Sequence, residues 1–315
     1  MCSVWSIPSD ELSVAEMTEI LAKLRKEGFA AVEVSGGEPF LRSDLLEILE
    51  VLDGLGFLYS VNTNGTLLTP ELIHRLDSRV GLLQLAISLD SLSPERYAQL
   101  RGTDSLPRVL QSLDMISVAR PRFPVKLNVT MSRMNRDEIL DILALAKGRG
   151  LGVSVFPVVR GVGHAHRADD PALAATDAEL AEMAELFKHL AVLRRAGEPL
   201  WEYSGYYDVA AEYVSGHSIG ECDAGRVFFD LRANGDLAAC VDLPAFASLR
   251  TDDAGAAMAR VENESARIRE CSATTPCCYT CTANITETAQ HPVRFALEEA
   301  RVRMRAAQRR WEQPR

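Results

Sequence analysis

Residues 33–45 read EVSGGEPFLRSDL and place two glycines, a glutamate and a proline where a strand is expected to end. Gly36 and Gly37 allow positive φ and let a ligand approach the main chain. Pro39 has no backbone N–H, so nearby carbonyl groups can face a ligand instead of continuing a ladder. Glu38 can add a charge-assisted contact to an ammonium group. This strand end suits a zwitterionic ligand with an amino group, although the tetrapeptide alone is equally compatible with an ordinary turn.

Outward from this turn, helix and strand patterns alternate through the first half of the chain, as is typical of βα units around a parallel sheet. Ser13 and Glu16 form a capping box for the first helix, which Gly28 ends. Five strands are expected, at residues 30–35, 57–62, 82–88, 125–131 and 152–159. Helices are expected near 43–55, from 70, over 94–118 and near 136–148. The sequence therefore predicts an α/β domain with a parallel sheet.

The charge balance bears on the partners. The 315 residues include 34 Lys and Arg against 44 Asp and Glu, for a net charge of -10. This disfavours nonspecific attraction to nucleic acid or anionic lipid and favours a small-molecule or peptide substrate. No apolar window approaches the roughly 20 residues that span a bilayer, and the start MCSVWSIPSDELS has no basic leader or signal-length apolar run. We predict a cytoplasmic globular protein with no nucleic-acid or membrane partner.

The second half begins with a connector rich in Gly, Ala and Asp over residues 161–175. A helix capped by Thr176 and Glu179 follows and runs to Gly197. From about residue 216 the sequence changes to cysteines, short strands and loops. Its stretch RVFFDLRANGDLAACVDL predicts a hairpin with the Asn–Gly pair at 234–235 in the turn. A basic amphipathic helix is expected over the last twenty or so residues.

Cysteine usage separates the two halves of the chain. Six of the seven cysteines fall in the last third, namely Cys222, Cys240, Cys271, Cys277, Cys278 and Cys281. In a reducing compartment such clustering favours metal ligation over disulfides. Structural zinc is one candidate, because zinc sites also use four thiolates and C-x2-C pairs.

Four successive strand ends together resemble those of radical S-adenosylmethionine (SAM) enzymes. They read SGGEPFLRSDLLEIL, VNTNGTLL, ISLDSLSPERYAQLRGTDSL and LNVTMSRMN, and the resemblance covers nearly all of the first 160 residues. It implies a partial (β/α)6 radical SAM barrel whose first strand is missing. It implies that Gly36, Gly37, Glu38 and Pro39 hold the methionyl amino group of SAM. The other cofactor-binding residues that it implies are Asn64, Ser88, Asp90, Asn128, Arg133, Phe156 and Val158, with Asn62 and Thr130 as further candidates.

The resemblance also implies a C-x3-C-x2-C loop after the first strand, whose three thiolates hold a [4Fe-4S] cluster. This sequence has one cysteine there, Cys2, which resembles the third ligand. We expect the other two ligands and the first strand to lie before Met1, in which case the chain is N-terminally truncated and its activity requires those ligands. The alternative is a degenerate protein that has lost its cluster.

The C-terminal cysteine spacing resembles the SPASM and twitch extensions of the same family, which bind auxiliary [4Fe-4S] clusters. The spacing is C-x12-G-x4-C from Cys222 to Cys240 and C-x5-C-x3-C from Cys271 to Cys281. Ile268 stands where the fuller pattern has a cysteine, so one auxiliary cluster is expected. The expected ligands are Cys222, Cys240 and Cys281, with Cys278 or Cys277 as the fourth and Cys271 as a structural thiol.

The resemblance implies cleavage of SAM to a 5'-deoxyadenosyl radical that abstracts hydrogen from a peptide or small molecule. The auxiliary cluster would transfer electrons, and a donor such as flavodoxin or ferredoxin is expected. The predicted domains are a partial barrel at 1–170, a helical connector at 171–215, a cysteine-rich α+β auxiliary-cluster domain at 216–290 and a C-terminal helix at 291–315. Aromatic residues over 201–213 are expected to pack between domains rather than to wall the barrel mouth. The rival function is a noncatalytic binding protein with a zinc or iron-sulfur tail.

Overall fold

The structure, a computed structural model, describes residues 10–159, 173–217, 220–274, 277–278 and 283–312, the last ten by their backbone alone. Its first unit is a parallel sheet of five strands in the order β1-β2-β3-β4-β5. The strands are β1 (Ala31–Val34), β2 (Leu58–Thr63), β3 (Leu82–Ser88), β4 (Val125–Met131) and β5 (Gly152–Pro157). The helices between them are α1 (Val14–Lys26), α2 (Leu45–Gly54), α3 (Pro70–Asp77), α4 (Pro94–Arg101), α5 (Leu106–Ala119) and α6 (Ile139–Gly148), with short 3-10 turns η2 (Pro39–Leu41) and η3 (Arg136–Glu138).

The predicted strands and the first capping box are confirmed. The Ser13 side chain accepts from the Glu16 amide, and the Glu16 carboxylate accepts from the Ser13 amide. The helical stretch expected over 94–118 is present as two helices, α4 and α5. Gly102 ends α4 in the left-handed conformation, with φ 71°. A new helix then begins with proline in its first turn.

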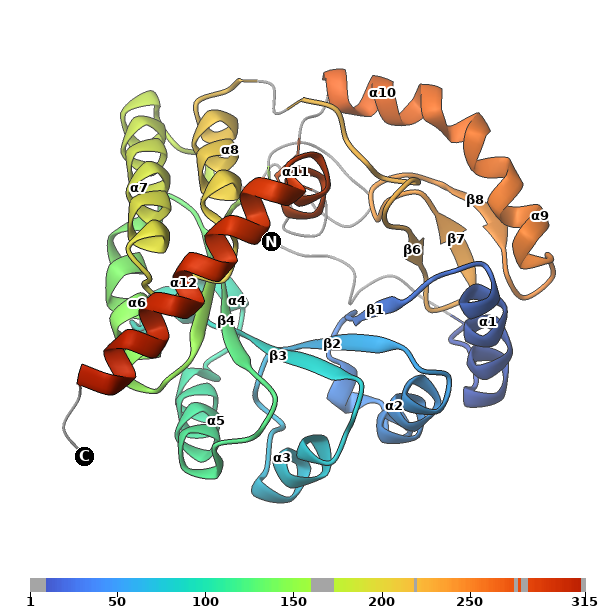
Figure 1. The fold of residues 1–315 in the computed structure, drawn as a ribbon, viewed down its shortest axis with the longest axis horizontal. Helices are drawn as coiled ribbons and strands as arrows, with labels where there is room; N and C mark the ends of the chain where they lie inside the picture. Colours follow the sequence, from blue (N-terminus) through green and yellow to red (C-terminus); the bar gives the residue numbers. More distant parts are fainter. Residues whose placement is uncertain (1–9, 160–172, 218–219, 275–276, 279–282, 313–315) are drawn as a thin grey trace.

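The two faces of the sheet differ in polarity. One face packs on helices, and its residues Val61, Leu85, Ile87, Leu127, Val129, Val153 and Val155 are fully buried. Because side chains alternate along a strand, the intervening residues share the other face. Asn62 pairs in register with Ala86, and Asn128 pairs with Ser88 on one side and Ser154 on the other. We call this polar side the inner face. In Figure 1, α2, α3 and α5 lie on one side of the sheet and the C-terminal unit lies across the other.

A helical pair follows the sheet, made of α7 (Asp177–Arg195) and α8 (Ser204–Val214). The capping box of Thr176 and Glu179 is confirmed. Between the helices, Leu200 forms a parallel bridge with Val153 at the edge of β5. Helix α8 falls within the predicted helical connector but was not predicted as a separate helix, because most of its residues are buried and its polar face is narrow, formed by Asp208 and Glu212. The expected aromatic packing is confirmed, since Tyr203, Tyr206, Tyr207 and Tyr213 are at most 6% exposed.

The C-terminal unit is an antiparallel sheet flanked by helices. Its strands β6 (Asp230–Leu231), β7 (Asp236–Ala238) and β8 (Ala245–Ser248) pair in that order, and the hairpin turn at 234–235 is confirmed. The alanine-rich stretch after Asp253 forms a capped helix, which fits the α+β unit expected here. The helical elements are α9 (Ala254–Ala259), η5 (Arg260–Glu264), α10 (Ser265–Thr274), α11 (Ile285–Gln290) and the confirmed C-terminal helix α12 (Pro292–Glu312).

The units are packed together. The small sheet shares an apolar core with α1, in which Leu12, Ile20 and Leu24 meet Leu237 and Leu249. Helix α12 crosses the helical pair, as Figure 1 shows. Among the helices that the structure describes, none combines the length and apolarity needed to cross a membrane.

Candidate cofactor site and C-terminal thiols

The GGEP turn is held in shape by Glu38. One oxygen of its carboxylate accepts a hydrogen bond from the Thr63 hydroxyl at 2.7 Å, and the other accepts from the Asn64 amide at 2.6 Å. The first oxygen also accepts from the Phe40 amide at 3.2 Å. Glu38 therefore joins the end of β1 to the end of β2. Its contact with an ammonium group stays a prediction, because no ligand is present to test it.

The backbone of this turn is open. Gly36 has φ 141°, a region that favours glycine, and a Cβ placed there would have no heavy atom within 4 Å. Gly37 is exposed, whereas Pro39 is buried. The amide and carbonyl groups at 36 and 37 are thus accessible to a ligand. The side-chain oxygen of Asn64, by contrast, already accepts hydrogen bonds from the amide and the hydroxyl of Thr66, at 2.8 and 2.7 Å.

Three polar side chains form a row across the inner face. The Asn62 amide group donates to the Glu33 carboxylate at 2.8 Å, and the Asn128 amide group donates to Asn62 Oδ1 at 3.5 Å. Ala86 is the register partner of Asn62 on β3, and Ser88, two residues further on, is the partner of Asn128, so the two asparagines meet diagonally across β3. A carboxylate only accepts, so Glu33 requires the NH2 of Asn62, and Asn62 Oδ1 then requires the NH2 of Asn128. Asn128 Oδ1 is therefore left as an acceptor.

That oxygen is buried and has no hydrogen-bond partner among the residues that the structure describes. An unsatisfied buried acceptor is costly and needs an explanation, such as a ligand that donates to it. Its register neighbour Ser154 does not supply a donor, since the Ser154 hydroxyl donates to Glu202. Ser88 is half-buried beside Asn128 on the same face. The inner face thus offers an acceptor at the strand end where the sequence predicted cofactor contacts.

Asp90 has a different setting from the one predicted. Its side chain is 1% exposed, and its oxygens accept from the Thr130 amide at 2.7 Å and from Arg101 at 3.1 Å. Burial opposes the charge of Arg101, but the Asp90 carboxylate outweighs it, so the pKa of Arg101 is raised. We propose that Asp90 positions the ends of β3 and β4 and does not contact a cofactor.

The remaining predicted residues fall in two places. Phe156 is half-buried and pairs in register with Thr130, and the Val158 amide donates to Met131 at 2.8 Å. These two residues extend the strand-end region. Arg133 instead lines a shallow cleft with residues of α4, η3 and α7, and it lies 3.8 Å from Glu179. The structure therefore does not place Arg133 with the inner-face row, and its role toward SAM stays a prediction.

Sequence reasoning missed a buried polar cluster beneath Asn128. The Glu202 carboxylate is 1% exposed, lies 3.8 Å from the Lys126 ammonium and accepts from Ser154 and Tyr207. Lys126 also sits over the Trp201 ring, 5.5 Å from its centroid. Burial, together with the Glu202 charge, raises the pKa of Tyr207 well above its usual value. The only signal in the sequence was an acidic residue inside an aromatic run.

The C-terminal thiols gather on one small core. Cys222 and Cys271 pack against the cluster that contains Ala224, Ala239 and the buried Cys240. Burial raises the pKa of Cys240 to about 12, and the nearby thiolates of Cys277 and Cys222 act in the same direction. Burial also raises the pKa of Cys222, and the nearby Cys271 acts in the same direction.

Cys278 points elsewhere. It is fully buried, its carbonyl accepts from the Tyr206 hydroxyl at 3.2 Å, and burial raises its pKa. The predicted ligands Cys2 and Cys281 lie outside the described residues. Within the described part of the chain, no three His, Cys, Asp or Glu side chains are close enough together to hold a metal ion. The predicted four-thiolate set is thus not assembled by the described residues alone.

The arrangement of residues at the strand ends indicates a class of protein. Polar side chains and an open glycine turn at the carboxyl ends of parallel strands are the usual ligand site of an α/β enzyme. Residues 1–146 match the profile described as the Radical SAM superfamily. Residues 1–146 are thus similar to this superfamily, which confirms the resemblance seen in the sequence.

Sequence relatives are similar over the same half. The chain is 33% identical over 149 residues to an AdoMet-dependent heme synthase of Methanosarcina barkeri, which covers 47% of this chain and 42% of that protein. It is 35% identical over 155 residues to a probable GTP 3',8-cyclase of Saccharolobus solfataricus, with 48% and 49% covered. The chain thus spans about half the length of the curated relatives it matches.

Two solved structures share the fold over most of the chain. SuiB of Streptococcus suis, in its complex with the precursor peptide SuiA, aligns with a TM-score of 0.62 at 14% identity and covers 82% of this chain and 61% of its own. The enzyme anSMEcpe with bound AdoMet and the Cp18Cys peptide gives a TM-score of 0.61 at 12% identity, with 82% and 74% covered. The shared fold extends past residue 146 into the C-terminal part, and the predicted fold class is confirmed.

Proposed function

We propose that this radical SAM protein binds SAM at the carboxyl ends of β1 to β5 and uses it to abstract hydrogen from a peptide. The observation that carries the proposal is the unpaired Asn128 Oδ1 on the same inner face as the open GGEP turn. The main chain at Gly36 and Gly37 would hold the methionyl amino group. Asn128 and Ser88 would meet the ribose, and Phe156 and Val158 would flank the adenine.

The cluster at this site needs three thiolates, and Cys2 is the one cysteine among the first 221 residues. The chain as given therefore supplies one ligand. When bound beside a reduced [4Fe-4S] cluster, SAM supplies the 5'-deoxyadenosyl radical that gives the family its chemistry. The residues of the inner face bind and orient the nucleoside, and the packed C-terminal unit excludes water.

We further propose one auxiliary [4Fe-4S] cluster in the C-terminal unit, held by Cys222, Cys240, Cys281 and Cys277. Thiolates suit iron-sulfur clusters, and Cys222 and Cys277 both act to raise the pKa of Cys240, after burial as the main cause. Cys277 is preferred over Cys278, because Cys278 is fully buried and Cys240 responds to Cys277. The Ala224 amide already lies 3.4 Å from the Cys222 sulfur, as a backbone donor to a ligating thiolate would. We propose a role in electron transfer, with a flavodoxin or ferredoxin as external donor.

A peptide substrate is preferred to a small molecule for one reason. Both fold relatives have structures with bound peptides, and that fold likeness extends over the C-terminal unit. The heme synthase and cyclase relatives, which act on small molecules by their names, match only the first half. Because the fold likeness is at low identity, the substrate class remains our proposal.

Replacing Asn128 with leucine should separate binding from folding. The change removes an acceptor that has no partner among the described residues, together with the long bond that Asn128 donates to Asn62 at 3.5 Å, so the free energy of unfolding without ligand should change by less than about 1 kcal/mol. The Kd for SAM should rise about tenfold, the effect of one lost hydrogen bond. Thermal unfolding and isothermal titration measure the two quantities.

The control is Gln84→Leu, a similar change on β3 nearer its start, which should leave the Kd within about twofold. An Asn128→Leu protein that binds SAM as tightly as the parent would contradict the assigned role. Equal weakening by both substitutions would point to a general effect of polarity on this face.

The decisive experiment is anaerobic reconstitution with iron and sulfide, followed by assay of 5'-deoxyadenosine formation under reducing conditions. It should be run on this chain and on a version extended by the in-frame codons upstream of Met1. We expect the extended version, if it supplies two further cysteines, to form 5'-deoxyadenosine. Failure of such a version to turn brown or to cleave SAM would favour the noncatalytic alternative.

A further inference from the structure

Residues 10–12 lie between the two units of the molecule and are held from both. The Asp10 and Glu11 carbonyls accept from Arg250, at 3.1 and 3.2 Å. The Leu12 carbonyl accepts from Arg42 at 2.6 Å, and the Leu12 amide donates to the Ala233 carbonyl at 2.8 Å. Every carbonyl of this segment is thus bonded to a guanidinium.

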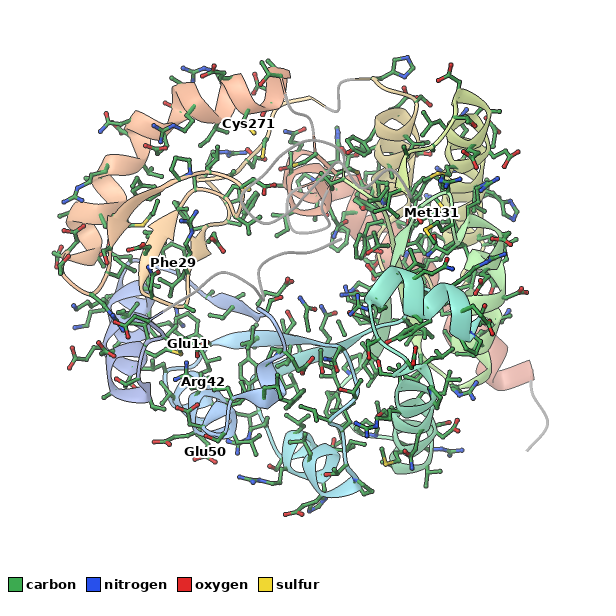
Figure 2. All side chains as sticks on the ribbon, turned by 180° about the vertical axis from the view of Figure 1, so that it is seen from behind. Glu11, Phe29, Arg42, Glu50, Met131 and Cys271 are labelled. Carbon is green, nitrogen blue, oxygen red and sulfur yellow. The ribbon has the colours of Figure 1, made fainter. Side chains whose placement is uncertain are left out.

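Arg42 joins the segment to the GGEP turn. Its amide donates to the Pro39 carbonyl at 3.0 Å, so the residue belongs to the turn itself. Its guanidinium bonds to Asp44 at 2.6 and 3.1 Å and to Glu11 at 3.2 Å. The hydrogen bond to Arg42 lowers the pKa of Asp44. Figure 2 shows Glu11 and Arg42 near each other, between α1 and α2.

Arg250 joins the same segment to the C-terminal sheet. It follows β8, donates to the Asp10 carboxylate at 2.6 Å and lies 3.4 Å from Glu16 in α1. The hydrogen bond to Asp10 raises the pKa of Arg250. The tip of the β6–β7 hairpin touches the same place, since a Cβ at Gly235 would come within 3.2 Å of Leu12 and 3.1 Å of Arg250.

Apolar contacts seal this junction. Leu12 is 1% exposed in a core shared with Leu237 and Leu249. Nearby, the rings of Phe29 and Phe229 meet edge to face at 5.4 Å. An ordinary domain interface would pair side chains, whereas here both arginines bond to the main chain. Main-chain bonds fix the path of a segment and not only its contact surface.

We propose that Arg42 and Arg250 are positioning residues that clamp residues 10–12, so that the C-terminal unit sets the path of this segment, just ahead of α1, relative to the GGEP turn. The clamp itself does not depend on the proposed function, and only its expected effect on SAM binding rests on that function. Because coupling between sites is reciprocal, SAM bound at the turn must stabilise the hairpin by as much as the hairpin strengthens SAM binding.

Hydrogen exchange of the full chain without SAM tests the clamp itself. In Arg250→Gln, the Leu12 amide should exchange roughly tenfold faster or more, because its bond to Ala233 depends on the held path. Exchange should also rise in the peptide that covers residues 36–42, which Arg250 does not touch. The matched control is Arg260→Gln, a substitution in the same unit whose ion pair to Asp252 is local. It should leave both peptides unchanged.

Adding SAM tests the consequence. In the parent protein SAM should slow exchange over residues 233–250, and in Arg250→Gln that protection should be lost while the Kd rises severalfold. Unchanged exchange at 36–42 in ligand-free Arg250→Gln overturns the clamp, whether or not SAM binds. A parent protein that shows the clamp but no SAM binding refutes the proposed function instead. Arg42→Lys keeps the charge and loses the forked geometry, so it should reproduce the Leu12 effect without unfolding the chain.

Discussion

Replacing Cys240 with serine should lower the iron content of the anaerobically reconstituted C-terminal unit from about four atoms per chain to nearly none, because a cubane needs its thiolate ligands. Cys240 is the most central of the described thiols, since both Cys222 and Cys277 act on its pKa. The brown colour and the charge-transfer absorption of the cluster should disappear with the iron. Iron, sulfide and zinc quantified on the same sample measure the effect.

The matched control is Cys278→Ser. Cys278 is adjacent to Cys277 but fully buried, so its loss should leave the iron content unchanged. Iron lost from Cys278→Ser and kept in Cys277→Ser would reverse the assignment of the fourth ligand. One zinc and no sulfide in the parent protein would replace the cluster by a structural zinc site.

Glu202→Leu should lower the free energy of unfolding by about 3 to 5 kcal/mol, the usual cost of removing one partner from a buried ion pair. The substitution leaves the Lys126 ammonium, 8% exposed, without its carboxylate. It also removes the acceptor of the Ser154 and Tyr207 hydroxyls. Chemical denaturation followed by circular dichroism measures the change.

Two variants check that the buried charge is the cause. Glu198→Gln removes a nearby carboxylate whose partner Lys147 is half-exposed, and it should cost less than about 1 kcal/mol. Lys126→Met combined with Glu202→Leu should recover most of the lost stability, since an apolar pair replaces the ion pair. If the double variant is as unstable as Glu202→Leu alone, shape and not charge explains the loss.

The local structure was largely predictable. Capping residues such as Ser13 and Thr176, the alternation of apolar residues and the Asn–Gly turn at 234–235 depend on neighbours within a few positions, and all were confirmed. The errors arose where local patterns fail. Gly102 divides the helical stretch over 94–118, and α8 has only a narrow polar face, so its pattern in the sequence is weak.

The similarity to the radical SAM superfamily was predictable from four strand-end motifs, because each motif is a continuous stretch of sequence. The setting of individual site residues was less visible. Asp90 matched a strand-end pattern, but its burial and its bonds to Thr130 and Arg101 show a carboxylate already satisfied by the protein. The spacing of residues in the sequence does not show whether a polar group can still form a further hydrogen bond.

The sequence by itself determined the parallel sheet, the GGEP turn at its edge and the cysteine-rich second unit. Only the tertiary structure decided that Asn62 and Asn128 meet across β3, that Lys126 pairs with Glu202, and that Arg250 bonds to Asp10, 240 positions away. The reason is physical: hydrogen bonds and ion pairs act within a few ångströms, and strand register and unit packing, not sequence spacing, bring those atoms together.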